Sequence, residues 1–271
     1  MIPISASKFS PFPIFSKGKN LNKKLCDMLD RKNCFFFDRG ASTLFVLLSI
    51  LKRRSKRKKI IIPSYTADTV YIPAIQAGCE VKFCDMSLDS FNMDLRHLRK
   101  IVDKDTLAVI GVHLFGIPEN MDEIEKIAEK HNVFVIDDFC QALGSKYKNK
   151  YAGSFGDASV LSFGKGKNLT AFDGGALFLD DDELIDEVND IYKDLDKPSE
   201  IKKAFKIFGL SILSRPFWYG IFYRVLSRYR QVPAPEKIEV KKITKVQKNL
   251  ISNLIDKKDK NLKQRALWGI S

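Results

Sequence analysis

Two lysines on a glycine-rich stretch are the first residues of this 271-residue chain that are suited to chemistry. Lys165 and Lys167 lie within Ser162-Phe163-Gly164-Lys165-Gly166-Lys167. A neutral lysine amine in a sheltered site can form a Schiff base, whereas a charged lysine can bind phosphate. The spacing of the glycines does not match the GxxxxGK[ST] pattern of a P-loop. Schiff-base chemistry and phosphate binding both stay open for this stretch.

A pair of adjacent carboxylates, Asp137 and Asp138, follows the apolar run Val133–Ile136. Successive residues of a strand point to opposite faces of the sheet. One aspartate can therefore enter a site while the other caps a turn or faces solvent. An ordinary surface turn is the alternative interpretation of this pair.

A third candidate, Gly40-Ala41-Ser42, follows the apolar run Cys34–Phe37 and opens a helical pattern. Glycine and small residues at a helix N-terminus let backbone N–H groups approach an anion, and the helix dipole favours phosphate there. The alternative is an ordinary turn in which Ser42 caps the helix. The surrounding elements decide which interpretation carries more weight.

Strand-length apolar runs alternate with helical patterns along the first half of the chain. The runs predict strands at Cys34–Phe37, Ile60–Ile62, Val81–Cys84, Leu107–Val112 and Val133–Ile136. Helices are expected over residues 41–53, 67–77, 94–102 and 120–131. This rhythm indicates an α/β fold with a mostly parallel sheet and helices on both faces. In such a sheet ligands bind beyond the carboxyl ends of the strands, where the three candidates lie.

The pattern divides the chain into two predicted regions. Residues 1–200 form a large α/β domain, and residues 201–271 are basic and largely helical. Residues 205–226 are apolar and aromatic, but Lys206, Arg215-Pro216 and Arg224 interrupt them. A spanning helix needs about 20 mostly apolar residues, so we expect two packed helices broken at Pro216 and no transmembrane span. Contact with a membrane surface or another subunit stays open.

Composition narrows the class of protein. The net charge is +13, and the five cysteines form no CxxC pair, which favours free thiols in a reducing compartment. The N-terminus lacks the apolar core of a signal peptide, so a cytoplasmic location is expected. Three scattered histidines suggest no metal site. The basic run at 52–59 lacks interleaved aromatic residues, so we expect a solvated loop rather than a nucleic-acid site.

A family resemblance joins these signals. Between about residues 34 and 190 the chain resembles the DegT/DnrJ/StrS sugar aminotransferases, through RGASTL, IIIPSYTADTV, AGCEVKFCDMSLDSFNMD, VIGVHLFGIPENMDEI, VIDDFCQALGSKYKNKYAGSFGDASVLSFGKGKNL and FDGGAL. The resemblance implies an aspartate aminotransferase fold, pyridoxal 5'-phosphate as cofactor and a homodimer. It also implies transfer of an amino group from an amino acid, usually glutamate, to a nucleotide-linked keto-sugar for cell-surface polysaccharide or secondary-metabolite synthesis.

The resemblance assigns roles residue by residue. Lys167, four positions after Phe163, becomes the lysine that forms the Schiff base, and Lys165 a neighbour. Asp138 becomes the acid that keeps the cofactor's pyridine nitrogen protonated. Gln141 lies beside the cofactor's ring hydroxyl. The phosphate cup is assigned to Ser162 and to the turn Gly40-Ala41-Ser42.

Some features depart from the family pattern. Ala67 stands where the family commonly has an aromatic residue that stacks on the ring, and Ala41 where it has a threonine. Residues 190–235 lack the usual His-Gly and Asn-x-Arg phrases. The family chain normally continues into a small C-terminal domain, so we expect most of that domain to be absent, with residues 244–268 as its start.

Two alternative functions stay open. One is a pyridoxal-phosphate-dependent sugar dehydratase, although by resemblance such relatives carry histidine where this chain has Lys167. The other is an inactive or truncated subunit of the same fold that acts as a binding or membrane-surface partner.

Overall fold

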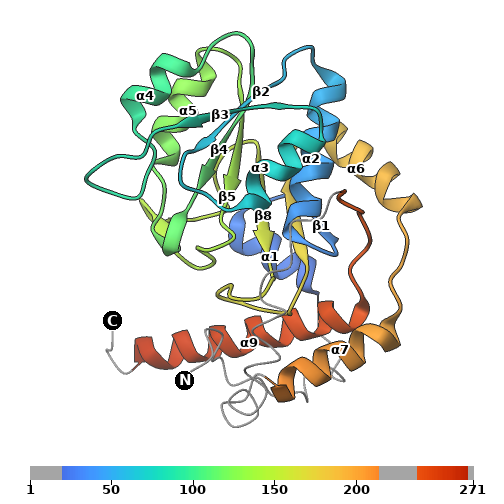
Figure 1. Cartoon of the computed structure of the whole chain (residues 1–271). Coiled ribbons are helices and arrows are strands. Elements are labelled where there is room, and N and C mark those ends of the chain that lie inside the picture. Colours follow the sequence, from blue (N-terminus) through green and yellow to red (C-terminus); the bar gives the residue numbers. More distant parts are fainter. Residues whose placement is uncertain (1–19, 214–236, 268–271) are drawn as a thin grey trace.

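A seven-stranded sheet organises the part of the chain that the computed structural model describes, residues 20–213 and 237–267 (Figure 1). The predicted break at Pro216 and the linker at residues 233–235 lie outside these ranges. The strands are β1 (Asn33–Phe37), β2 (Lys59–Pro63), β3 (Glu80–Cys84), β4 (Thr106–Val112), β5 (Phe134–Asp138), β8 (Ala158–Ser162) and β9 (Gly175–Leu179). Their order across the sheet is β1-β9-β8-β5-β4-β2-β3.

The sheet is mostly parallel, as the sequence predicted. Strands β3, β2, β4, β5 and β8 pair in parallel, and only β9 runs antiparallel to its neighbours β1 and β8. A separate hairpin, β6 (Lys146–Tyr147) and β7 (Lys150–Tyr151), lies between β5 and β8 in the chain. The carboxyl ends of β1, β2, β3, β4, β5 and β8 therefore meet at one edge of the sheet.

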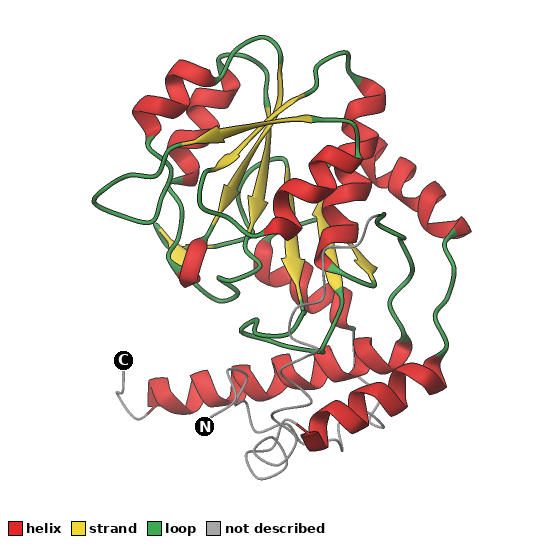
Figure 2. Ribbon diagram, in the orientation of Figure 1, coloured by secondary structure: helices red, strands yellow, loops and turns green. Residues whose placement is uncertain are grey.

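Helices cover both faces of the sheet (Figure 2). One face packs against α2 (Gly40–Arg54), α3 (Asp68–Gln76) and α6 (Asp182–Asp194). The other face packs against α4 (Leu95–Ile101) and α5 (Met121–Glu129), and against α1 (Leu21–Leu29) and α9 (Lys245–Leu267). Helix α7 (Glu200–Leu213) lies beside α9, and the 3-10 turn η2 (Leu114–Gly116) follows β4.

Strand β1 shows how the sequence fills both layers. Phe35 and Phe37 enter the core beneath α2, whereas Cys34 and Phe36 enter the core beneath α1 and α9. The alternation follows from the two-residue period of a strand, and a fully buried Phe contributes about 2–3 kcal/mol of transfer free energy. The near-continuous apolar run is thus the signature of a strand buried on both faces.

The region after residue 200 is fixed to the sheet at two places. Ile207, Leu250 and Ile251 are buried in the same core cluster as Phe36. At the edge of the sheet, Phe37 forms an antiparallel bridge with Lys242, and the Asp38 amide donates to the Lys241 carbonyl at 2.9 Å. The division into regions 1–200 and 201–271 remains a prediction, but the described parts of both share one core.

Charge neutralisation explains the basic run at residues 52–59. Arg54 pairs with Glu187 at 2.6 Å, Lys58 pairs with Glu80, and Lys59 pairs with Asp103 at 2.5 Å. Arg57 donates to the carbonyls of Thr106, His131 and Asn132. The run therefore connects elements at the amino ends of the strands. This supports its interpretation as a structural, solvated segment.

All five cysteines are free thiols, as expected. Among the described residues, no helix is both long and apolar enough to cross a membrane.

A loop at residues 152–157 is fixed by the buried side chain of Arg31. The Arg31 guanidinium donates to backbone oxygens and to two side chains: Gly153 O at 3.2 Å, Gly156 O at 3.1 Å, Phe155 O, Ser159 Oγ at 2.6 Å and Asp180 Oδ2 at 2.6 Å. Gly153 and Gly156 have φ of 101° and 65°, a region that favours glycine. The phrase GSFGD thus encodes a loop shape that Arg31 and two glycines maintain.

Replacing Arg31 with methionine should lower the free energy of unfolding by about 2–4 kcal/mol, because several buried acceptors lose their donor. Chemical denaturation measures the change. Lys32→Ala is the matched control, since Lys32 forms only an exposed pair with Asp182 and should cost less than about 1 kcal/mol. Equal stability of the Arg31→Met variant and the parent would contradict this role of the guanidinium.

Candidate active site

The site is built where the carboxyl ends of β1, β5 and β8 converge. The turn into α2 follows β1, Asp138 ends β5, and Ser162 ends β8. Strands β5 and β8 are hydrogen-bonded neighbours, with Asp138 in register with Val160. The topology therefore brings together the three places that the sequence selected separately.

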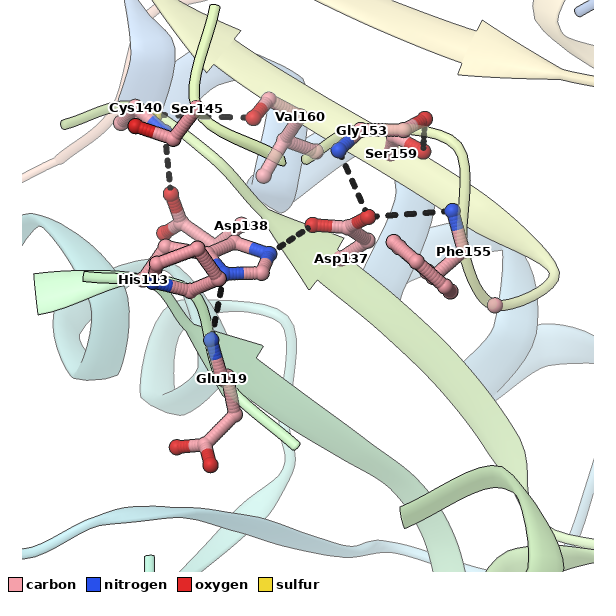
Figure 3. A network of polar contacts seen from close by, with 12 residues as sticks. His113, Glu119, Asp137, Asp138, Cys140, Ser145, Gly153, Phe155, Ser159 and Val160 are labelled. Carbon is pink, nitrogen blue, oxygen red and sulfur yellow. Dashed lines mark hydrogen bonds and ion pairs between the residues drawn. The ribbon is translucent and has the colours of Figure 1, made fainter. Parts of the chain in front are cut away.

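The two aspartates of β5 point in opposite directions and have separate functions (Figure 3). Asp137 is fully buried and accepts hydrogen bonds from the amides of Gly153 at 2.7 Å and Phe155 at 3.1 Å. It thus holds amides of the 152–157 loop, whose carbonyls are held by Arg31. Asp138 takes no part in that loop, because its Oδ1 accepts from the Cys140 amide at 3.0 Å. The pair is not a surface turn, since both residues belong to a buried strand.

His113 is a buried positioning residue whose tautomer follows from its partners. Its Nδ1 accepts from the Glu119 amide at 2.7 Å, so the ring proton must be on Nε2. Nε2 lies 2.7 Å from Asp137 Oδ1, to which it donates. A neutral imidazole thus joins the end of β4 to β5 and keeps Asp137 turned away from the site.

Asp138 has an electrostatic environment suited to binding a cation. Burial raises the pKa of Asp138, while hydrogen bonds from Cys140 and the nearby positive charge of Lys167 lower it. The side chain is 3% exposed. A buried carboxylate of this kind is stabilised by a positive charge that enters the site.

Lys167 lies within electrostatic range of Asp138, on the loop that follows β8. Its amide donates to the Gly164 carbonyl at 3.3 Å, and Gly166 has φ of 80° with open space around it. This tight turn exposes Lys165 to solvent and leaves Lys167 half-buried. Lys167, rather than Lys165, is therefore the lysine whose charge acts on the buried carboxylate.

The turn at Gly40 packs directly against the end of β8. A Cβ added at Gly40 would lie 2.8 Å from Ser162 Cβ, and one added at Gly175 would lie 2.5 Å from the Arg39 carbonyl oxygen. The absence of both side chains lets the first turn of α2 approach Ser162. The Ser162 hydroxyl accepts from the Gly164 amide at 3.2 Å. A hydroxyl and the N-terminal amides of α2 thus lie at one place, as a phosphate cup requires.

Ser42 has a buried partner of its own. Its hydroxyl donates to Asp38 Oδ1 at 2.8 Å, and that oxygen also accepts from the Lys241 amide at 3.2 Å. Burial raises the pKa of Asp38, and these bonds lower it. The structure therefore shows the Ser42 side chain bracing the turn, while Ala41 beside it is half-buried.

Replacing Gly40 with alanine should lower both stability and cofactor affinity, because the new methyl group displaces Ser162 from the turn. Overpacking of this kind costs about 1–3 kcal/mol. The comparison is Gly209→Ala in α7, where nothing lies within 4 Å of the added Cβ and a gain of about 0.5–1 kcal/mol is expected. Denaturation and titration with pyridoxal phosphate measure the two effects. A Gly40→Ala variant with full affinity would remove the turn from the site.

Gln141 is oriented by the backbone of η2. Its Oε1 accepts from the Phe115 amide at 3.2 Å, so its side-chain NH2 group is left as the donor. Phe115 has φ of 57° and is 58% exposed. It contacts Tyr65 and Phe91, with ring centroids 6.1 and 5.1 Å apart. An exposed aromatic cluster of these three rings therefore borders the site.

One orphaned atom indicates that the site is built for a ligand. Thr66 Oγ1, in the loop after β2, is the one buried side-chain polar atom without a hydrogen-bond partner among the described residues. Ala67, which replaces the usual aromatic residue, is exposed next to it. Together with Asp138 and the Gly40 turn, this hydroxyl fits a phosphorylated, protonated heterocycle such as pyridoxal phosphate.

Sequence reasoning missed Thr66, Phe115 and Arg31. Nothing in the local pattern marks Thr66 as lacking a partner, because that depends on the loop between β2 and α3. Phe115 belongs to the VHLFG phrase and has a left-handed backbone. The available sequence signal for this turn was the glycine that follows it. Arg31 precedes β1 and acts on a loop more than 120 residues later.

Comparison with known proteins identifies the family of this chain. The model of the "DegT/DnrJ/EryC1/StrS aminotransferase family" matches residues 14–210, more than half of the chain. GDP-perosamine synthase of Escherichia coli O157:H7 is 35% identical over 136 residues, covering 49% of this chain and 36% of that protein. GDP-4-keto-6-deoxy-D-mannose 3-dehydratase of Escherichia coli O55:H7 is 34% identical over 132 residues, covering 49% and 34%. The chain thus spans about a third of the length of these two relatives.

Solved structures share the fold. The aminotransferase PseC of Helicobacter pylori superposes with a TM-score of 0.67 at 22% identity, over 89% of this chain and 58% of that one. An E. coli GDP-4-keto-6-deoxy-D-mannose-3-dehydratase with bound hydrated PLP superposes with a TM-score of 0.71 at 20% identity, over 95% and 68%.

The predicted α/β fold is therefore confirmed, and the enzyme class and pyridoxal-phosphate cofactor expected from the sequence are those of the matched family. The chain belongs to the DegT/DnrJ/EryC1/StrS aminotransferase family.

Proposed function

We propose that this chain binds pyridoxal 5'-phosphate and transfers an amino group from an amino acid, glutamate in the first instance, to a nucleotide-linked keto-sugar. The observation that carries the proposal is the half-buried Lys167 within electrostatic range of the buried Asp138, at the edge of the sheet where six strands end. The names of the relatives, a perosamine synthase and an altrosamine transaminase, support a sugar nucleotide as acceptor.

Each side chain of the site has a task in this reaction. When bound, the cofactor supplies an electron sink for a substrate that loses its Cα proton. The Asp138 carboxylate would hold a proton on the ring nitrogen, which would keep that sink effective. The Lys167 amine would accept the Cα proton of the substrate and return it later in the reaction. The Gln141 amide would hold the ring oxygen, and the first amides of α2, with Ser162, would hold the phosphate.

A sugar dehydratase is the second candidate. The sequence identity of this chain to a dehydratase, 34%, is nearly the same as its identity to the perosamine synthase, 35%. Lys167 favours the aminotransferase, since by resemblance the dehydratases have histidine at this position. An inactive subunit is the third candidate. The nearness of Lys167 to Asp138 favours an active site over an inactive one.

A spectral experiment separates the candidates. The purified chain is titrated with pyridoxal phosphate, reduced with borohydride and analysed for a modified lysine, and a second sample receives glutamate. An aminotransferase turns yellow, gives a reducible adduct and bleaches with glutamate. A colourless protein that pyridoxal phosphate does not colour would refute cofactor binding. A yellow protein that no amino donor bleaches would refute transamination.

The oligomeric state and the cellular location of the chain are also proposals. We propose a homodimer in the cytoplasm, with residues 1–200 as the cofactor-binding region and residues 201–271 as a helical region that begins the small domain. The five free thiols support a reducing compartment. Size-exclusion chromatography with light scattering tests the dimer.

A further inference from the structure

Within the described part of the chain, helix α7 is held against the body of the protein through Glu200, Lys203 and Ile207. The Glu200 carboxylate accepts from the amides of Lys245 and Val246 at 2.7 and 3.1 Å and so caps α9. Lys203 pairs with Asp173 at 3.4 Å, and Ile207 is fully buried. These contacts fix the rotation of α7 about its axis, with the helix lying beside α9 (Figure 1).

An apolar stripe runs along the outer side of α7. Ile201, Phe205 and Phe208 are 70%, 73% and 46% exposed. Their spacing of four and three residues places them on one line of the helix surface. Large apolar side chains that are aligned and exposed on an otherwise packed helix indicate an interaction surface.

A cationic hollow lies beside this stripe. It has a volume of about 460 Å³ and is lined by five lysines and one acidic residue: Lys197, Lys202, Lys203, Lys206, Lys241 and Asp196. Within the described ranges, no ion pair involves Lys197, Lys202 or Lys206, which contrasts with the neutralised basic run at residues 52–59. The excess positive charge near α7 is therefore available to an anionic partner.

We propose that α7 docks on an anionic lipid bilayer surface, with Phe205 and Phe208 entering the interface and the lysines of the hollow binding lipid phosphates. An interfacial helix combines an apolar aromatic side with flanking lysines, and α7 has both on a fixed element. Lys202, Lys203 and Lys206 belong to the same helix as the stripe and also line the hollow. A protein partner would match the stripe but would leave the adjoining cluster of lysines unexplained.

Sedimentation with vesicles tests the proposal on the full chain. We expect binding to phosphatidylcholine vesicles that contain phosphatidylglycerol, little binding to phosphatidylcholine alone, and weaker binding as salt is raised. The double variant Lys202→Ala/Lys206→Ala should reduce partitioning by about tenfold or more. The double variant Phe205→Ser/Phe208→Ser should reduce it by about tenfold.

Matched controls keep the test specific. Phe83→Ser and Lys82→Ala change exposed residues on β3, where Phe83 is 47% exposed, and should leave vesicle binding unchanged. Circular dichroism verifies that each variant is folded. Equal binding to neutral and anionic vesicles, or full binding by both α7 variants, would overturn the proposal. The proposal would also be overturned if the chain did not bind vesicles but formed an oligomer, and the Phe205→Ser variant dissociated that oligomer. This result would favour a protein interface.

Discussion

Replacing Lys167 with alanine should abolish the borohydride-reducible adduct and slow the half-reaction with glutamate by about 10³-fold or more. The amine is at once the group that attaches the cofactor and the base that moves the substrate proton, and a positioned base alone contributes about 10²–10⁴-fold. Stability should change little, because the Lys167 side chain is half-buried and forms no ion pair with the other described residues. Mass spectrometry of the reduced protein and stopped-flow absorbance give the two readouts.

Lys165→Ala is the matched control for that experiment. Lys165 lies two residues away on the same turn but is exposed. The variant should keep the reducible adduct and most of the rate. An adduct that persists in Lys167→Ala and disappears in Lys165→Ala would transfer the role to Lys165.

Replacing Asp138 with asparagine should slow the glutamate half-reaction by about 10²–10³-fold while the protein stays folded. The neutral amide cannot hold the ring nitrogen in its protonated form, so a preorganised electrostatic contribution is lost. Stopped-flow bleaching measures the rate. Asp137→Asn is the contrast, because Asp137 holds two loop amides and His113. It should mainly lower stability, by about 1–3 kcal/mol. A large rate loss in Asp137→Asn with a normal rate in Asp138→Asn would exchange their roles.

The same Asp138→Asn variant should be more stable than the parent when no cofactor is bound, by about 1 kcal/mol at neutral pH. Burial raises the pKa of Asp138, so the folded chain holds this proton more tightly than the unfolded chain. The contribution of Asp138 to stability is therefore largest below the ordinary aspartate pKa and is lost as the pH rises through the folded value.

Thermal unfolding of both proteins across this pH range checks the sign. The parent should lose stability relative to the variant as the pH rises, and pyridoxal phosphate should reduce the difference by stabilising the parent more than the variant. A variant that is less stable than the parent at every pH would show that the buried charge is already compensated.

The elements of the sheet could be predicted because their signals are local. Cys34–Phe37 and Leu107–Val112 are apolar runs of strand length, and they became β1 and β4 with changes of at most one residue. The run Val133–Ile136 was placed one residue early, since β5 continues through Asp137 and Asp138. Charged residues usually end a strand. Here the Asp137 carboxylate accepts hydrogen bonds from loop amides, and Asp138 lies in the candidate site.

The candidate site could be predicted only in part, because its contacts are distant in sequence. The adjacency of the Gly40 turn, Asp138 and Ser162 followed from the rule that ligands bind at the carboxyl ends of parallel strands. The partner of Ser42, by contrast, is the buried Asp38, which also accepts from the Lys241 amide. A segment about 200 residues away thus takes part in bracing the turn, and no local pattern announces it.

The bridge between Phe37 and Lys242 has a consequence for solubility. Strand β1 is an edge of the sheet and carries the sequence Asn33-Cys34-Phe35-Phe36-Phe37, which is strongly apolar. Bare edges of this kind pair with other copies and aggregate. Asn22 covers the Cys34 carbonyl at 2.9 Å, and the segment around Lys242 covers the end of the strand. Residues 241 and 242 therefore protect the edge strand from pairing with other copies. Shortened versions of the chain that lack them would become less soluble before the sheet unfolds.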